Sequence, residues 1–416
     1  MPQWSEYSTG ERIAIMRGAT LTQESLAELT GVSVQTIRNA EQDKTLTLPT
    51  LLKIAGALHT RTSVILGEEA PVRSMGLDDR KVLVRLSNTV HDVSAGLLPT
   101  DLDPVTVAEL DSLVRHAWQR YWDGEYGEVG GFAVQLLRQA AVTLHALPDG
   151  EQAAGHAVMS DAFRIAAYVA NLWGARDLAY AGIGHAAQAA RKAADPLRDA
   201  LVASGRAWVY LRDARLDDAL ALAEKAAVDI EPVRGRTATR DEWTVYGSHV
   251  NFAAVVASRM ERSDLAHTFL GESNMAGARM GAEHGAFGTL HGPTSAAVQA
   301  VGINVSLGEI SKASDLVDSL NRRQLSQLQE AAQRRYEMDL AQVLVAKSNY
   351  DAALSVIHDA VTASPNWAAH QTLPSVIVRR AGRLSTNRLR TVANLVGVRP
   401  IEGAPSFDPA TLKSAL

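Results

Sequence analysis

The longest regular feature of this 416-residue sequence is a pattern that recurs every 40 to 50 residues from about residue 105 onward. In each copy a small or apolar residue opens the second of two helical segments, and similar residues follow four and seven positions later. These anchor residues are Val129, Ala179, Ala219, Ala266, Ala313 and Ala353. One pair of short helices cannot bury its apolar face alone, so repeated pairs are expected to stack around a continuous core. The pattern predicts an all-α fold in which the pairs form a right-handed α-solenoid.

A second set of small residues lies twelve positions before the later anchors, in the first helix of each predicted pair. Its members are Ala167, Ala207, Ala254, Val301 and Ala341. This register resembles the tetratricopeptide repeat (TPR). The last copy fits best and ends at Pro365, whereas the others are degenerate. The resemblance implies that residues 81–383, called the body below, form a TPR-like domain with a concave inner face.

Polar and aromatic residues are predicted on that concave face, where they would meet a ligand. Asparagine can hold a peptide backbone through its donor and its acceptor, and arginine can bind a carboxylate with two hydrogen bonds. The predicted ligand-binding set is Arg164, Tyr168, Asn171, Trp208, Asn251, Ser295 and Arg335. Each residue alone is also compatible with ordinary packing or a solvated surface. Together they predict a groove for a peptide or a small-molecule effector.

Composition excludes several classes of function. The chain has no cysteine, which excludes disulfides, thiolate metal sites and cysteine nucleophiles. No HExxH, Walker, GxSxG or GxGxxG motif stands in a suitable context, so we expect no enzyme activity, no metal and no cofactor. His284 and His291 flank a glycine-rich turn and are more typical of flexible surface histidines than of a site. With no secretory signal and no membrane-spanning apolar run, a cytoplasmic location is expected.

Residues 1–67, called the head below, predict five short helices. Thr22, Ser33 and Thr47 are suitable N-cap residues for the second, third and fourth helices. Gly31 lies between the second and third helices, where a tight turn needs a residue that tolerates positive φ. The second helix is expected to bury Leu26, Ala27 and Leu29, and the fifth to end at Gly67.

The outward face of the third helix carries side chains suited to the edges of DNA bases. Glutamine and asparagine can pair with adenine, arginine can pair with guanine, and valine can contact a thymine methyl group. The base-reading positions are Val34, Gln35, Arg38 and Asn39. The net charge of −5 argues against indiscriminate nucleic-acid binding, so the basic groups must be arranged by face. The full predicted DNA-binding set is Gln23, Ser33, Val34, Gln35, Thr36, Arg38, Asn39, Gln42 and Lys44.

The segment LTQESLAELTGVSVQTIRNAEQ resembles the Cro/C1 or XRE-type helix-turn-helix of phage repressors and many bacterial regulators. The family's glutamine falls on Gln23, its turn glycine on Gly31 and its capping residue on Ser33. The loop before Leu21 is shorter and less basic than is usual. The resemblance implies a double-stranded DNA operator read by a homodimer.

An XRE-type head joined to a degenerate repeat body resembles the actinobacterial XRE regulators. In that group a Phe-Gly-Pro-Thr-Asn-like stretch recurs, and its counterpart here is FGTLHGPTS, which begins at Phe287. Ser295 stands where that stretch has asparagine.

These observations predict four segments: the head (1–67), a linker (68–80), the body (81–383), and a C-terminal helix and tail (384–416). The predicted function is a sequence-specific transcription regulator whose body dimerises and senses a small ligand or peptide. The alternatives are a TPR-based adaptor and a phage-type repressor whose body only oligomerises. Leucine and valine recur at helical spacing over residues 79–97, which indicates either a dimer contact or a helix packed on its neighbour.

Overall fold

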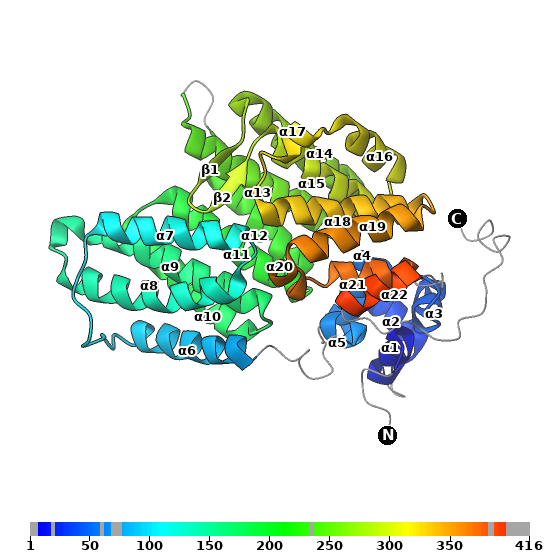
Figure 1. Ribbon diagram of the computed structural model, residues 1–416, viewed down its shortest axis with the longest axis horizontal. Coiled ribbons are helices and arrows are strands. Elements are labelled where there is room, and N and C mark those ends of the chain that lie inside the picture. The colour runs from blue at the N-terminus through cyan, green and yellow to red at the C-terminus, as the bar shows by residue number, and fades with distance from the viewer. Residues whose placement is uncertain are drawn as a thin grey trace. The chain divides into compact units, whose positions relative to one another are not determined.

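The computed structural model describes residues 7–17, 21–58, 62–67, 77–232, 237–381 and 387–396. These residues are helical apart from turns and one two-stranded hairpin, which confirms the predicted all-α class (Figure 1). The chain divides into two compact units. The larger contains Met1–Tyr121 and Tyr126–Gln299, and the smaller contains Trp122–Glu125 and Ala300–Leu416. Among the helices that the structure describes, none combines the length and the apolar character of a transmembrane segment.

The head contains the five predicted helices. Their bounds are α1 (Thr9–Arg17), α2 (Gln23–Thr30), α3 (Val34–Glu41), α4 (Leu48–Ala57) and α5 (Thr62–Leu66). The side chains of Thr22, Ser33 and Thr47 each accept a hydrogen bond from the backbone amide three residues later, so all three are N-caps as predicted. Gly31 ends α2 with a φ of 64°, the left-handed conformation that the turn requires.

Every helix of the head contributes a large aliphatic residue to the head core. The fully buried ones are Ile13, Leu26, Ile37, Ile54 and Ile65. Leu29 does not belong to it, contrary to the prediction, because 63% of this residue is exposed. The inner face of α2 instead carries Leu26, Ala27 and Thr30, which lie one and four positions apart, and this spacing turns Leu29 away from the core. The Thr30 hydroxyl is buried without penalty because it donates to the Leu26 carbonyl.

Helix α6 begins at Leu77, inside the predicted linker, and leads into the body, which continues as a series of long helices. In the larger unit these are α6 (Leu77–Ser94), α7 (Val107–Trp122), α8 (Tyr126–Ala146), α9 (Gln152–Leu172), α10 (Arg176–Ala193), α11 (Pro196–Arg212), α12 (Leu216–Asp229), α13 (Arg240–Arg259) and α14 (Ser263–Met280). A short 3-10 helix, η2 (Asp149–Glu151), precedes α9. From α8 to α14 each helix contacts the next one along the chain. The strands β1 (His284–Ala286) and β2 (Thr289–His291) follow, and α15 (Pro293–Ser306) crosses the division between the units.

The smaller unit contains the remaining helices. They are α16 (Ile310–Ser319), α17 (Arg322–Leu325), α18 (Glu330–Ala346), α19 (Tyr350–Ala363), α20 (Pro365–Ala369), α21 (Leu373–Ala381) and α22 (Asn387–Leu395). Helices α18 and α19 contact each other, and α21 contacts both of them. The predicted tail beyond residue 396 lies outside the described residues, as do residues 68–76 of the predicted linker and the loop at residues 18–20.

The turn inside each helix pair is built in the same way. A residue with positive φ stands five positions before every anchor: Gly124 (84°), Gly174 (75°), Ala214 (58°), Glu261 (60°), Gly308 (76°) and Ser348 (61°). All six anchors are fully buried. The predicted repeat is therefore a recurring local structure, in which a helix, a left-handed turn residue and a second helix follow one another. Since three of the six turn residues are not glycine, the anchors reveal the repeat better than the glycines do.

Helix α6 uses its apolar seam for contacts within the chain. Leu86 and Val90 are fully buried, and α6 contacts α8 in the same unit. Of the two interpretations left open by the sequence, the structure favours a helix packed on its neighbour.

We expect the substitution Gly308→Ala to destabilise the protein through the backbone alone. A Cβ at residue 308 would meet no atom within 4 Å, but its φ of 76° is unfavourable for alanine. The expected loss is about 1 kcal/mol. Gly271→Ala is the matched control, because residue 271 is equally uncrowded but lies inside α14. It should stabilise the chain by about 0.5 to 1 kcal/mol. Urea unfolding measures both changes, and equal midpoints for the two variants would contradict the role given to this turn.

Candidate nucleic-acid interface and effector site

The outward face of α3 presents the four predicted base-reading residues together. Gln35 and Arg38 are exposed, and Val34 and Asn39 are partly exposed. The opposite face is fixed to the head core by Ile37 and Ala40, which are buried. Gln35 Nε2 donates to Asn39 Oδ1 at 2.9 Å, so the two amides are already aligned along the helix. This face can therefore meet a duplex without any rearrangement of the head core.

Arg38 is held in place by residues of α2. Its Nε donates to Gln23 Oε1 at 3.2 Å, and its Nη2 donates to Glu24 Oε1 at 3.3 Å. About half of the Arg38 side chain remains exposed, and the Glu24 side chain is more exposed still. An ion pair with this exposure is screened by solvent and contributes little to stability, so Arg38 can exchange Glu24 for a base or a phosphate.

Four of the other five predicted DNA-binding residues lie at the two ends of α3, and the fifth, Gln23, begins α2. Ser33 and Thr36 form the N-terminal cap, with the Thr36 amide donating to Ser33 Oγ at 3.0 Å. Gln42 and Lys44 follow the C-terminal end and are exposed. The predicted set is thus divided between the open face of α3, its cap, the residues that follow it and the start of α2.

Glu41 connects helices α1, α2 and α3. The sequence pattern did not indicate this role. Its carboxylate accepts from Arg17 Nε at 2.6 Å and Nη2 at 3.3 Å, and from Gln23 Nε2 at 2.5 Å. Arg17 also donates from Nη1 to the Leu21 carbonyl. The hydrogen bonds that Arg17 donates to Glu41 raise the pKa of the Arg17 guanidinium, which stays charged. One carboxylate at the end of α3 therefore fixes the orientation of the helix relative to α1 and α2.

The structure brings together four of the seven residues predicted to bind a ligand. Arg164, Tyr168 and Asn171 lie on one face of α9, at the i, i+4, i+7 spacing of a helix. Trp208 of α11 contacts Tyr168, with 5.0 Å between the ring centroids.

The other three do not join that cluster. Asn251 Oδ1 accepts from the Ser273 hydroxyl at 3.2 Å, and Ser295 donates to Glu283. Arg335 belongs to the smaller unit, where it is paired with Asp339 on the same helix. Each of these side chains is engaged by a near neighbour.

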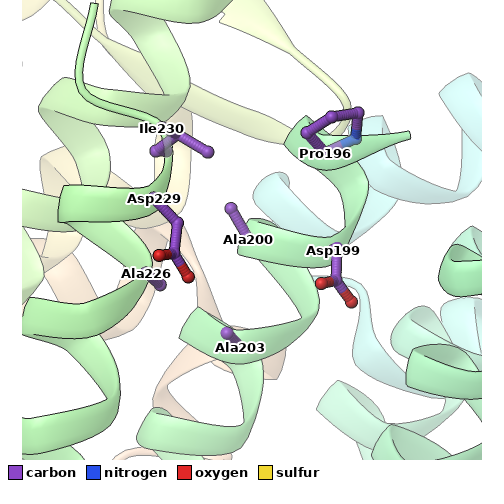
Figure 2. A pocket seen from close by; sticks show the side chains of 7 residues that line it. All are labelled: Pro196, Asp199, Ala200, Ala203, Ala226, Asp229 and Ile230. Carbon is purple, nitrogen blue, oxygen red and sulfur yellow. The ribbon is translucent and has the colours of Figure 1, made fainter. Parts of the chain in front are cut away.

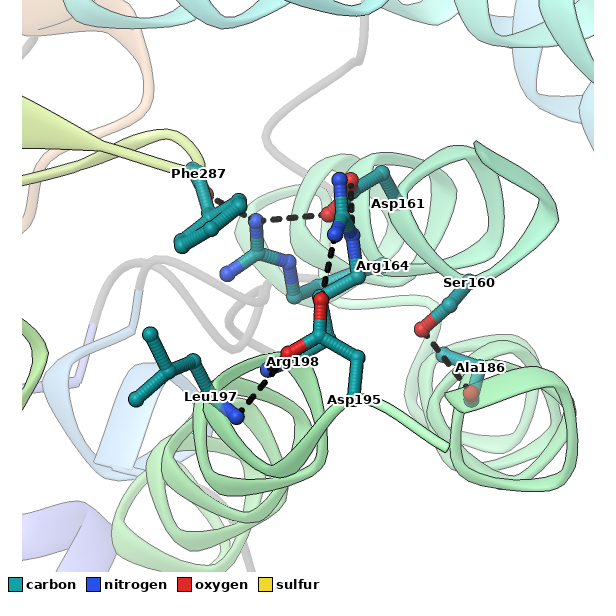
Figure 3. A network of polar contacts seen from close by, with 8 residues as sticks. All are labelled: Ser160, Asp161, Arg164, Ala186, Asp195, Leu197, Arg198 and Phe287. Atoms are coloured by element: carbon teal, nitrogen blue, oxygen red, sulfur yellow. Dashed lines mark hydrogen bonds and ion pairs between the residues drawn. The ribbon is translucent and has the colours of Figure 1, made fainter. Parts of the chain in front are cut away.

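Arg164 is the centre of a buried ionic network (Figure 3). Only 2% of Arg164 is exposed, and its Nη2 donates to Asp161 Oδ1 at 3.0 Å. The second oxygen of Asp161 accepts from Arg198 Nε at 2.9 Å. Arg198 also donates to Asp195, the N-cap residue of α11. Burial lowers the pKa of Arg198, but the two carboxylates more than offset this effect and the pKa is raised.

Aromatic rings from four helices line the same region. Trp118 of α7 contacts Tyr121 at 5.5 Å and Tyr168 at 5.4 Å, measured between centroids. Its ring also lies 4.6 Å below the Arg164 guanidinium. Tyr126 of α8 extends the cluster through Tyr121. Burial raises the pKa of Tyr121 and Tyr168, so these walls stay neutral. The sequence reasoning did not single out Trp118, because nothing local relates it to α9.

The glycine-rich segment that contains two histidines forms the β1–β2 hairpin. His284 and His291 face each other at its open end, and Ala286 pairs with Thr289 at its tip. His291 is fully buried and its Nε2 lies 3.1 Å from the Ser273 carbonyl. The interpretation as a flexible surface histidine is therefore wrong for His291. Burial lowers its pKa, which keeps the ring neutral, and Gly247 provides the space for it.

A separate pocket lies between α11 and α12 (Figure 2). Its lining is Pro196, Asp199, Ala200, Ala203, Ala226, Asp229 and Ile230. The pocket offers two carboxylates and small apolar side chains but no basic group. Among the described residues, no cluster of three or more histidines and carboxylates could hold a metal ion.

Comparison with known proteins identifies the head. Residues 14–65 match the helix-turn-helix family model. The matched segment contains α2, the Gly31 turn and α3, and it supports an XRE-type DNA-binding domain of the kind found in transcription regulators. A search of curated proteins and a search of solved structures found no significant match to the chain.

Proposed function

We propose that this protein controls transcription by binding a specific DNA operator through α3, as a homodimer whose body senses an effector. The observation that supports it best is the open face of α3 in a matched helix-turn-helix, with Gln35, Arg38 and Asn39 aligned on it. The recognition helix of such a motif lies in the major groove and its partner helix contacts the backbone. Arg38 would then read guanine, and Gln35 or Asn39 would read adenine.

Dimerisation follows from the geometry of operators. Each head reads one half-site, and two half-sites lie about one helical turn, roughly 34 Å, apart. The body would hold two heads at this spacing. An effector that binds one arrangement of the body better than another shifts the population between them, and this changes the affinity for the operator.

We further propose that the body is a TPR-like α-solenoid that binds the effector. The six equivalent turns and their buried anchors support a repeat architecture. The buried network around Arg164 supports sensing over the adaptor and the purely oligomerising alternatives, since convergent buried polar groups are a feature of ligand sites.

The test is specific DNA binding by an α3 variant. Wild-type full-length protein selects its operator from a pool of random duplexes, and gel shifts at one fixed salt concentration then compare variants. We expect Arg38→Ala with Asn39→Ala to weaken operator binding by about a hundredfold or more, because each bidentate base contact contributes about 1 to 3 kcal/mol. The control is Leu29→Ala, an exposed position outside the predicted interface, which should bind normally. Unchanged affinity and sequence preference in the double variant, with an intact circular dichroism spectrum, would refute the assignment.

A further inference from the structure

The tip of the β1–β2 hairpin has an unusual residue in a strained conformation. Phe287 and Gly288 form a two-residue turn between Ala286 and Thr289, and both have positive φ, 48° and 77°. Turns of this kind normally begin with asparagine, aspartate or glycine. A bulky residue with positive φ is strained, and such strain persists where surrounding contacts enforce it. The contacts made by the Phe287 side chain and carbonyl supply that enforcement.

The tip contacts the ionic network as a ligand would. The Phe287 carbonyl accepts a hydrogen bond from Arg164, although 123 residues separate them. The Phe287 ring stacks on the Arg198 guanidinium at 4.6 Å (Figure 3). Gly288 lies directly against Trp118, because a Cβ at residue 288 would be 2.4 Å from Trp118 Cε2. The carbonyl oxygen thus contacts Arg164, the aromatic ring contacts Arg198, and the glycine contacts Trp118.

Two buried donors on α7 and α9 have no acceptor among the described residues, and the one on α7 lies beside the tip. These are Trp118 Nε1 and Asn171 Nδ2, on residues that are 3% and 5% exposed. Trp118 Cε2 is bonded to Nε1, so a group in the place of Gly288 would lie beside this N–H. A buried donor without an acceptor destabilises its surroundings, and an added acceptor removes that penalty. The tip therefore satisfies only part of the hydrogen-bonding capacity around it.

The charges of the network favour a neutral occupant. Two arginines, Arg164 and Arg198, are matched by two carboxylates, Asp161 and Asp195. An added carboxylate would place an unmatched negative charge in a buried region, which is unfavourable. A neutral carbonyl oxygen adds no charge and is the group that Arg164 already binds.

We propose that the Arg164–Arg198 site binds a small neutral molecule that carries an aromatic ring and a carbonyl oxygen, in place of the Phe287–Gly288 tip. Its ring stacks on Arg198, its oxygen accepts from Arg164, and a further acceptor meets Trp118 Nε1. This inference rests on the proposed function, because it gives the effector a chemical class and a site.

Only the tip of the hairpin has to move to admit such a molecule. At the base, His291 is fully buried and bonded to the Ser273 carbonyl. Glu283 accepts from the Thr294 amide at 2.7 Å and from the Ser295 amide at 3.2 Å, which fixes the start of α15. The two-residue turn can therefore leave the site while both ends of the hairpin stay in place.

The test uses the variant Phe287→Asn and the probe N-acetylphenylalaninamide, which carries the ring and the carbonyl of the tip. Asparagine favours this turn, so the hairpin is retained while the ring is removed from Arg198. Calorimetry with the full chain should show that Phe287→Asn binds the probe at least about tenfold more tightly than wild type, because the competing ring is gone. N-acetylleucinamide, which lacks the ring, and N-acetylphenylalanine, which is anionic, should bind more weakly than the probe.

Two further variants test whether the probe is bound by the two arginines or only by apolar packing. In the Phe287→Asn background, Arg164→Met removes the donor to the carbonyl and Arg198→Met removes the stacking partner. Each should weaken probe binding by about tenfold. Arg198→Met remains informative if Arg164→Met fails to fold, because Arg198 is the less buried of the two. No binding by Phe287→Asn, or equal binding with and without the arginine, would overturn the proposal. Gel shifts on the same proteins test operator binding separately, so failure of the regulator function and failure of this site are distinguishable.

Discussion

Replacing Gly10 with alanine is expected to abolish specific DNA binding by disrupting the head. Gly10 lies in the first turn of α1, where the end of α3 passes unusually close. A Cβ at this position would lie 2.2 Å from the Glu41 carbonyl oxygen and 2.7 Å from that of Ala40. Both obstacles are backbone atoms, so no side-chain rotation can relieve the overlap, and α1 must separate from α3.

The expected loss of stability is about 3 kcal/mol, at the upper end of the range for overpacked sites. A domain of roughly 60 residues has about 3 to 9 kcal/mol in total. The substitution would also displace the Gly10 amide, which donates to Asp43 Oδ1 at 2.7 Å just beyond α3. In the Gly10→Ala variant the helices of the head should therefore no longer pack stably on one another, and α3 should lose its fixed orientation.

Hydrogen exchange and gel shifts on the full chain measure this effect. We expect rapid exchange throughout α1, α2 and α3 and no operator complex. Gly31→Ala is the matched control, since its φ of 64° is unfavourable but a Cβ there would meet no atom within 4 Å. It should lose only about 1 kcal/mol and keep most of its DNA binding. Similar behaviour of the two variants would show that the α1–α3 contact is not the critical one.

The head could be predicted from the sequence because its determinants are local. N-caps act on an amide three residues away, and the Gly31 turn needs positive φ at one position. The Arg17–Glu41 pair could not be predicted, because 24 residues separate its members and nothing in either segment specifies the partner. The role of Gly10 could not be predicted for the same reason, since it depends on the close approach of the α3 backbone.

The repeat spacing of the body could be predicted from the sequence, but the complete set of residues around Arg164 could not. Spacing between small residues located all six buried anchors, because close helix packing imposes a requirement at each repeat. Helical spacing also placed Arg164, Tyr168 and Asn171 on one face. The other elements of the site come from distant segments, and the β1–β2 hairpin, which stands among helices in the described part of the chain, interrupts the helical periodicity.

Loss of the Asp161 carboxylate should be the most destabilising single change in the ionic network. Asp161 is 2% exposed and is shared by Arg164 and Arg198, one oxygen for each. Asp161→Leu would leave Arg164, among the described residues, with a hydrogen bond to the Phe287 carbonyl and a contact with the Trp118 ring, neither of which carries a compensating charge. Removing one partner from a buried ion pair typically costs about 3 to 5 kcal/mol, because a charge is left uncompensated.

Urea unfolding, followed by tryptophan fluorescence, tests this expectation against two other variants. Asp218→Leu is the matched control, because Asp218 pairs with Arg215 at the surface and its loss should cost less than about 1 kcal/mol. The triple variant Asp161→Leu, Arg164→Met and Arg198→Met removes the three most buried charges and leaves only Asp195, which is partly exposed and still accepts from the backbone amides of α11. It should recover much of the lost stability, since apolar replacement of buried ionic groups is often tolerated. If the triple variant is no more stable than Asp161→Leu, uncompensated charge is not the cause. The stability of the region would then depend on the hydrogen bond from Arg164 to the hairpin tip, which the triple variant lacks and Asp161→Leu retains.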